Sequence, residues 1–121
     1  MIDYRKYLVW QKSHQLVLDM YRVTATFPKS EQFNLISQIN RACLSIPTNI
    51  AEGCGRETQK ELIRFLYISS GFAHELEYLL LVSKDLNFIN GDTYIKLNSE
   101  VNEIKKMLAS LIRKVAQTVN R

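Results

Sequence analysis

Apolar residues in the last third of the chain recur at alternating spacings of four and three. This spacing gathers apolar side chains on one side of an α-helix, and that side must then be covered by other helices. The residues concerned are Leu97, Val101, Ile104, Leu108, Leu111 and Val115. The pattern predicts a long helix that runs to about Asn120 and packs within a helical bundle.

Three earlier segments carry related patterns, and we expect helices over residues 9–25, 31–52 and 58–86. The third of these opens with Thr58 and Glu61, spaced as in a capping box. The chain of 121 residues holds only four glycines and two prolines, too few turn formers for an all-β fold. Short connections make sequential helices antiparallel. Residues 1–121 are therefore predicted to form a single all-α domain, an antiparallel up-down-up-down four-helix bundle.

Pro47 falls inside the second predicted helix. An interior proline removes one hydrogen bond and bends a helix more often than it ends it. The apolar period continues through Pro47, so we predict one bent helix, capped at its start by Ser30. A break at Ser45 is the competing interpretation. Gly53 and Gly55 are expected to form the following turn, with Gly53 at a positive φ.

The third predicted helix is apolar on more than one side. A helix in a monomeric four-helix bundle needs only one buried stripe. The excess predicts a second buried face, most simply an interface between copies of the chain. The apolar residues are Leu62, Ile63, Phe65, Leu66, Ile68, Phe72, Leu76, Leu79, Leu80, Leu81 and Val82.

The net charge of +4 is concentrated near the C-terminus. Against the seam of the last helix, Lys106 and Arg113 point away from the core, with Lys105 and Lys114 on its flanks. Such residues attract nucleic-acid phosphates. The alternative is that they complement the dipole of the helix C-terminus and carry no ligand.

Residues with catalytic chemistry are sparse. His14 and His74 stand apart and lack the spacing of a zinc or di-iron site, and Cys43 and Cys54 lack a metal spacing. Gly53 to Arg56 has no P-loop ending, so we interpret it as a structural turn. The expectation is a protein with no metal, no cofactor and no enzymatic activity. Without a signal-like start or a run long enough to span a membrane, it is expected in the cytoplasm.

A polar stripe follows the second predicted helix at spacings of three or four residues. These side chains share one face of the helix. The stripe is either solvated, or it bridges neighbouring subunits, or it faces a ligand on the inner wall of an oligomer. Its members are Gln38, Arg41, Ser45, Asn49 and Glu52.

An ordered set of motifs across three helices resembles the four-helix-bundle family of proteins encoded in intervening sequences of 23S ribosomal RNA genes. The strongest block is Asn49-Ile50-Ala51-Glu52-Gly53 with Arg56, which follows Arg41-Ala42 and Ser45-Ile46-Pro47. Further marks are Trp10, Phe27-Pro28, Gln38, Phe65-Leu66, Ser70-Gly71 and Glu75-Leu76. The chain departs from the family at Phe72, where a small polar residue is frequent.

The resemblance implies an antiparallel bundle that assembles into a ring, typically a homopentamer. The family also includes relatives of the accessory protein of diversity-generating retroelements, a basic ring that binds nucleic acid and associates with a reverse transcriptase. No catalytic residues come with the family. Two hypotheses follow: an oligomeric RNA- or DNA-associated adaptor, or an oligomeric scaffold for a protein partner.

Overall fold

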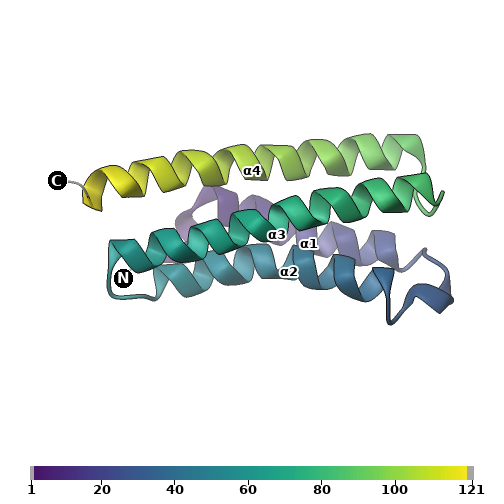
Figure 1. Ribbon diagram of the computed structural model, residues 1–121, viewed down its shortest axis with the longest axis horizontal. Helices are drawn as coiled ribbons and strands as arrows, with labels where there is room; N and C mark the ends of the chain where they lie inside the picture. The colour runs from purple at the N-terminus through teal and green to yellow at the C-terminus, as the bar shows by residue number, and fades with distance from the viewer. Residues whose placement is uncertain (1, 120–121) are drawn as a thin grey trace.

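The computed structural model describes residues 2–119, which form four long helices and two short 3-10 turns (Figure 1). Consecutive helices run in opposite directions, and the first and last described residues lie at the same end of the bundle. No strand occurs within residues 2–119, so the predicted all-α up-down bundle is confirmed. The elements are η1 (Tyr4–Lys6), α1 (Leu8–Thr24), η2 (Lys29–Glu31), α2 (Leu35–Cys54), α3 (Gln59–Asp85) and α4 (Gly91–Val119).

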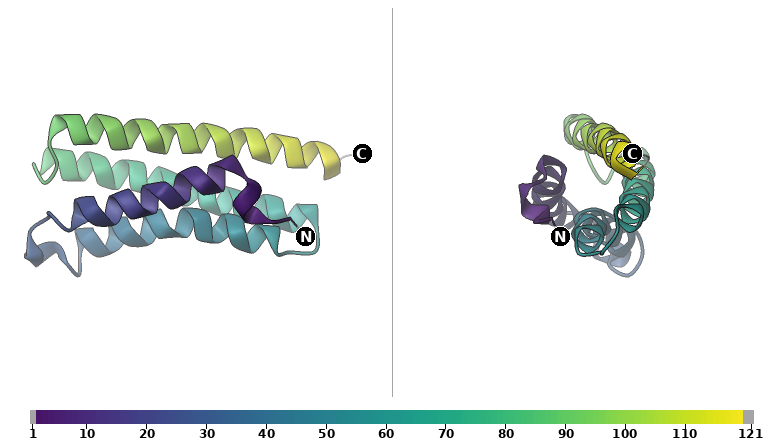
Figure 2. Two further views of the ribbon diagram at one scale, coloured as in Figure 1. Left: turned by 180° about the vertical axis from the view of Figure 1, so that it is seen from behind. Right: turned by 90° about the vertical axis from the view of Figure 1, so that its left-hand side faces the viewer.

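The four helices surround one apolar core (Figure 2). Helix α3 packs along its length against both α2 and α4, whereas α1 packs mainly on α2 and only lightly on α4. An exposed ion pair bridges this looser seam, from Lys12 Nζ to Glu103 Oε1 at 2.8 Å. The largest side chains that are fully buried in the core are Leu16, Met20, Ile39, Ile46, Ile50, Leu62, Leu66, Leu76, Leu80, Ile104, Leu108 and Val101.

The central position of α3 explains much of its apolar surface. Leu62, Leu66, Leu76 and Leu80 are all at most 2% exposed within a single chain, because α2 and α4 cover two sides of the helix. Part of the face that the sequence assigns to a subunit interface is therefore buried by the chain's own helices. A smaller apolar remainder stays exposed on α3, and it is described below with the other surfaces.

Helix α2 continues through Pro47, so the alternative of a break at Ser45 is wrong. Pro47 has no N–H to donate to the carbonyl four residues earlier. Side chains donate to carbonyls around it: Ser45 Oγ to Arg41 O at 2.7 Å, and Thr48 Oγ1 to Leu44 O at 2.8 Å. Pro47 itself is buried, and its packing helps to keep it inside the helix.

Both predicted ends of α2 need correction. The 3-10 turn η2 precedes α2, which starts at Leu35 after Asn34, so Ser30 does not cap it. At the other end Gly53 lies inside the helix, and no described glycine has a positive φ. A Cβ added at Gly53 would lie 2.8 Å from Phe65 Cβ. Gly53 is thus required by the close approach of α3 and not by a turn.

Thr58 caps the N-terminus of α3, but only half of the predicted capping box forms, because Glu61 Oε2 accepts from Arg64 Nε at 3.2 Å. Thr58 Oγ1 accepts a hydrogen bond from the backbone N–H of Glu61 at 3.1 Å. The predicted turn after α3 takes its left-handed residue from Asn87, at φ 63°, while Gly91 begins α4. Asn90 precedes that helix and accepts the Thr93 N–H through Oδ1 at 2.8 Å.

Helix α4 follows the predicted seam with one shift. Ile112 is 7% exposed, whereas Leu111 is only partly buried. The seam therefore steps from Leu108 to Ile112, because an α-helix of 3.6 residues per turn drifts from a strict heptad. The expected end at Asn120 lies outside the described residues, and α4 is described as far as Val119.

Candidate functional site

Helix α4 presents a basic face to solvent. Lys106, Arg113 and Lys114 are all exposed, as the seam register predicts. Within residues 2–119, none of the three has a carboxylate within ion-pair distance. We call these three residues the basic face. Its charges are exposed, and no described carboxylate neutralises them, so they are available to an anionic ligand.

Lys105, in contrast, forms an ion pair within the chain. Its Nζ donates to Glu77 Oε1 on α3 at 2.9 Å and lies 3.5 Å from Asn102 Oδ1. The ion pair is partly shielded, with 21% of the Lys105 side chain and 33% of the Glu77 side chain exposed. The hydrogen bond from Lys105 lowers the pKa of Glu77 below its ordinary value. The expectation that Lys105 is free to meet phosphate is therefore wrong; it ties α4 to α3.

The basic face adjoins the start of the chain. Lys114 lines a shallow hollow with Tyr7 and Leu8 from the start of α1 and with Met107 and Leu111 from α4. The sequence patterns did not predict this neighbourhood, because only the antiparallel fold brings the start of α1 beside α4.

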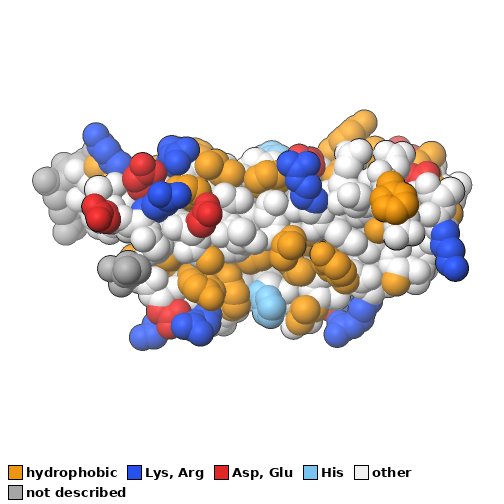
Figure 3. Space-filling view, turned by 90° about the horizontal axis from the view of Figure 1, so that it is seen from below, with side chains coloured by type: hydrophobic (Ala, Val, Ile, Leu, Met, Phe, Trp, Pro, Cys, Tyr) orange, Lys and Arg blue, Asp and Glu red, His pale blue; other side chains and the backbone are white. Residues whose placement is uncertain are grey.

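An apolar surface covers the outer side of the α1–α2 pair. Its most exposed members are Leu18, Tyr21 and Leu44, each between 41% and 48% exposed. Figure 3 shows hydrophobic side chains gathered in a band on this side of the molecule. We call this the α1–α2 surface.

Aromatic side chains form a groove along the same side of the bundle. The rings of Trp10 and His14 stack with 5.0 Å between centroids, and Tyr4 meets Trp10 edge-on at 5.0 Å. Leu44 and Pro47 of α2 line the groove opposite them. His14 is thus packed on an aromatic ring. His74 places Nδ1 2.8 Å from the Ser70 carbonyl oxygen, which requires the proton on Nδ1.

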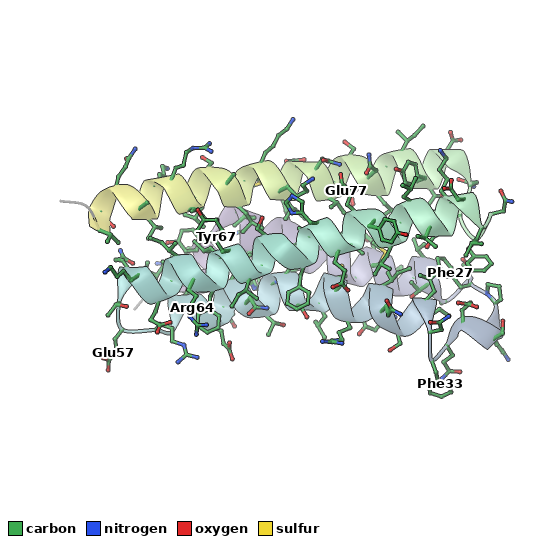
Figure 4. All side chains as sticks on the ribbon, viewed as in Figure 1. Phe27, Phe33, Glu57, Arg64, Tyr67 and Glu77 are labelled. Atoms are coloured by element: carbon green, nitrogen blue, oxygen red, sulfur yellow. The ribbon has the colours of Figure 1, made fainter. Side chains whose placement is uncertain are left out.

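A second apolar surface lies on α3. Tyr67 and Tyr78 are 62% and 64% exposed, and Leu81 is 39% exposed. Tyr67 is labelled in Figure 4. This α3 surface shares no residue with the α1–α2 surface. Two different apolar surfaces on one chain suit contact between unlike faces of neighbouring copies.

Some side chains of the polar stripe on α2 form hydrogen bonds within the helix. Asn49 donates from Nδ2 to Ser45 O at 2.7 Å, and Ser45 donates to Arg41 O. The side chains of Gln38, Arg41 and Glu52 are exposed. The middle of the stripe therefore hydrogen-bonds to backbone carbonyls of its own helix, and the ends of the stripe lie in solvent.

Arg56 of the family-like block contacts an aromatic ring. Its guanidinium lies 4.7 Å from the centroid of Phe65, and the guanidinium of Arg64 lies 4.8 Å from the same centroid. Two cations against one ring are consistent with cation–π attraction. These contacts fit the interpretation of residues 53–56 as a structural segment.

Both cysteines are buried thiols. Burial raises the pKa of Cys43 to about 12, and it also raises the pKa of Cys54. Because the thiolate is the reactive form, neither group is prepared for nucleophilic chemistry. Within residues 2–119, the helices also include none that is long and apolar enough to cross a membrane.

Comparison with known proteins identifies relatives for nearly the whole chain. Residues 5–110 match the family described as 23S rRNA-intervening sequence protein. No curated protein matches the chain. Among solved structures, it is similar to a protein of unknown function from the S23 ribosomal protein family of Bacteroides thetaiotaomicron VPI-5482. That likeness has 27% identity and a TM-score of 0.81, over 88% of this chain and 96% of the other. The chain belongs to the 23S rRNA-intervening sequence protein family.

Proposed function

We propose that this protein is a non-enzymatic, homo-oligomeric adaptor of the cytoplasm that binds RNA or DNA. The observation that carries the proposal is the basic face of Lys106, Arg113 and Lys114. These residues are exposed and have no carboxylate partner among the described residues.

Self-assembly is the second part of the proposal. The α1–α2 surface and the α3 surface both expose large apolar side chains. Contact between unlike surfaces of identical copies forms a ring when the rotation from one copy to the next closes. A pentamer is the stoichiometry that the family resemblance implies. Repetition of the basic face around a ring would multiply a weak phosphate contact through avidity.

Binding should be governed by charge and not by sequence. The basic face consists of two lysines and one arginine and includes no aromatic side chain that could stack on a base. Lysine and arginine contacts to phosphate weaken as the salt concentration rises. We expect affinity for single-stranded RNA and for DNA that falls steeply between about 50 and 200 mM salt.

The test is a charge-reversal variant with a matched control. Lys106→Glu, Arg113→Glu and Lys114→Glu together lower the net charge from +4 to −2. The same three reversals at exposed Lys29, Lys84 and Lys96 change the net charge equally and leave the basic face intact. Fluorescence anisotropy with labelled RNA should show binding lost in the first variant and largely retained in the control. Equal loss in both would show that only net charge matters.

The second candidate is an oligomeric scaffold for a protein partner. The exposed apolar side chains of Tyr67, Tyr78 and Leu44 favour it, because such surfaces bind protein as readily as they bind a second copy. If the unaltered protein binds neither RNA nor DNA at low salt, the scaffold becomes the better account.

A further inference from the structure

The most exposed large apolar side chain within residues 2–119 is Phe33, at 91%. It stands between η2 and α2, at the end of the bundle opposite the first described residue, and projects away from the helices (Figure 4). Single exposed apolar residues are common on protein surfaces. A phenylalanine exposed to this degree is informative only if a matching pocket exists.

The turn that carries Phe33 is held by hydrogen bonds on both sides. The Gln32 N–H donates to Lys29 O at 3.1 Å, and the Asn34 N–H donates to Glu31 O at 3.1 Å. The Asn34 side chain also reaches Glu31 Oε1 at 3.3 Å. Phe33 is thus held on an ordered turn, so its binding would require little further ordering of the backbone.

A pocket lies at the same end of the molecule. It opens between the end of α1 and the connection from α3 to α4, and its apolar part comes from Val23, Phe88 and Ile89. The Phe88 ring packs on Phe27 with 5.4 Å between centroids, which fixes the floor of the pocket. Arg22, Thr26, Asn90 and Thr93 complete the lining.

The pocket is chemically suited to the turn that bears Phe33. Aromatic side chains bind well in apolar pockets with a polar rim. Arg22 on the rim is 73% exposed, and its ion pair with Asp19 is a surface pair that is easily exchanged. Glu31 of the Phe33 turn carries the opposite charge.

We propose that Phe33 of one copy inserts into the Val23–Phe88–Ile89 pocket of the next copy. The exposure of Phe33 shows that it does not fill the pocket of its own chain. The Phe33 turn lies between η2 and α2, and the pocket lies between the end of α1 and the α3–α4 connection. These segments are at the same end of the bundle (Figure 1). Because the donor and the pocket are different surfaces, the same contact can repeat from copy to copy around a ring. This inference rests on the self-assembly of the proposed function and defines one of its contacts.

Cysteine cross-linking tests the contact directly. Phe33→Cys and Thr26→Cys are made as separate proteins, mixed, allowed to exchange subunits, and treated with a short bis-maleimide. Thr26 is exposed at the pocket rim. The native thiols are buried with raised pKa, and the protein without substitutions is the control for their reactivity. We expect a cross-linked dimer in the mixture and little from either protein alone.

A second pair of variants measures the contribution of the contact. Phe33→Ser should raise the concentration at which the oligomer dissociates about tenfold or more, as expected when a buried aromatic anchor is lost. Ile95→Ser removes a comparably exposed apolar residue, at 66%, that does not line the pocket, and it should leave that concentration unchanged.

The outcomes separate the two levels of the proposal. An oligomeric protein that gives no mixed cross-link, or whose assembly is equally insensitive to both serine variants, would overturn the Phe33 contact while self-assembly stands. A protein that is monomeric without any substitution would overturn both.

Discussion

Gly53 lies where α2 and α3 approach each other closely. We expect Gly53→Ala to lower the free energy of unfolding by about 1–3 kcal/mol, because the new Cβ would overlap Phe65 Cβ at 2.8 Å. Gly71→Ala is the control: a Cβ added there would meet nothing within 4 Å, and Gly71 is mid-helix and exposed. It should gain about 0.5–1 kcal/mol. Urea unfolding at one protein concentration checks both, and equal effects would refute the close-packing explanation.

The ion pair between Glu77 and Lys105 predicts a pH dependence. Its hydrogen bond lowers the pKa of Glu77 from an ordinary value of 4.5 in the folded state. The pair therefore stabilises the fold above that value, and the contribution is lost as pH falls through the lower, folded pKa. Glu77→Gln should cost about 0.2–1 kcal/mol at pH 7, as for a partly exposed pair. The difference from the unaltered protein should disappear in acid, and a difference that persists unchanged at pH 3 would contradict this assignment.

For single residues, the sequence patterns predicted which side chains are exposed better than which residues they contact. The seam of α4 correctly placed Lys106 and Arg113 in solvent. It could not show that Lys105 meets Glu77, since the partner is 28 residues away on another helix. The predicted role of Gly53 was wrong for the same reason. A close approach between two helices leaves no pattern in the local sequence, whereas a turn does.

At the scale of the element, α4 allows a direct test of its register. Ile112 is 7% exposed, and Leu111 is only partly buried. Ile112→Ala should therefore cost about 2–4 kcal/mol, and Leu111→Ala about half as much. Denaturant unfolding of the two variants at equal concentration decides the matter. A larger loss for Leu111→Ala would restore the strict heptad that the sequence predicts, or would place Leu111 in a subunit interface.

The number and approximate bounds of the helices could be predicted from apolar periodicity and from Thr58, and their direction from the short connections. The start of α2 could not, because Ser30 has the chemistry of a cap but lies in the short turn η2. The prediction that the second apolar face of α3 forms a subunit interface was also too simple. Only the packing order shows that α2 and α4 both cover this helix within one chain.

At the scale of the whole molecule, the basic face and the two apolar surfaces lie on different parts of one bundle. Lys106 and Arg113 belong to neither apolar surface, so assembly through those surfaces can leave the basic face of each copy exposed. Nucleic-acid binding should therefore depend on assembly: a variant that fails to assemble should lose affinity although its basic face is intact. Phe33→Ser provides this variant, and anisotropy at protein concentrations below its dissociation point provides the measurement. Full affinity in the dissociated protein would show that avidity has no part in binding.

The proposed function depends on the assembly of identical copies. Light scattering coupled to size-exclusion chromatography at micromolar concentration measures the mass of the assembly. We expect a mass several times the chain mass of 14.1 kDa, and five times that mass for the ring that the family resemblance implies. A single species of 14.1 kDa across the concentration range would contradict the ring, the Phe33 contact and the role of avidity together.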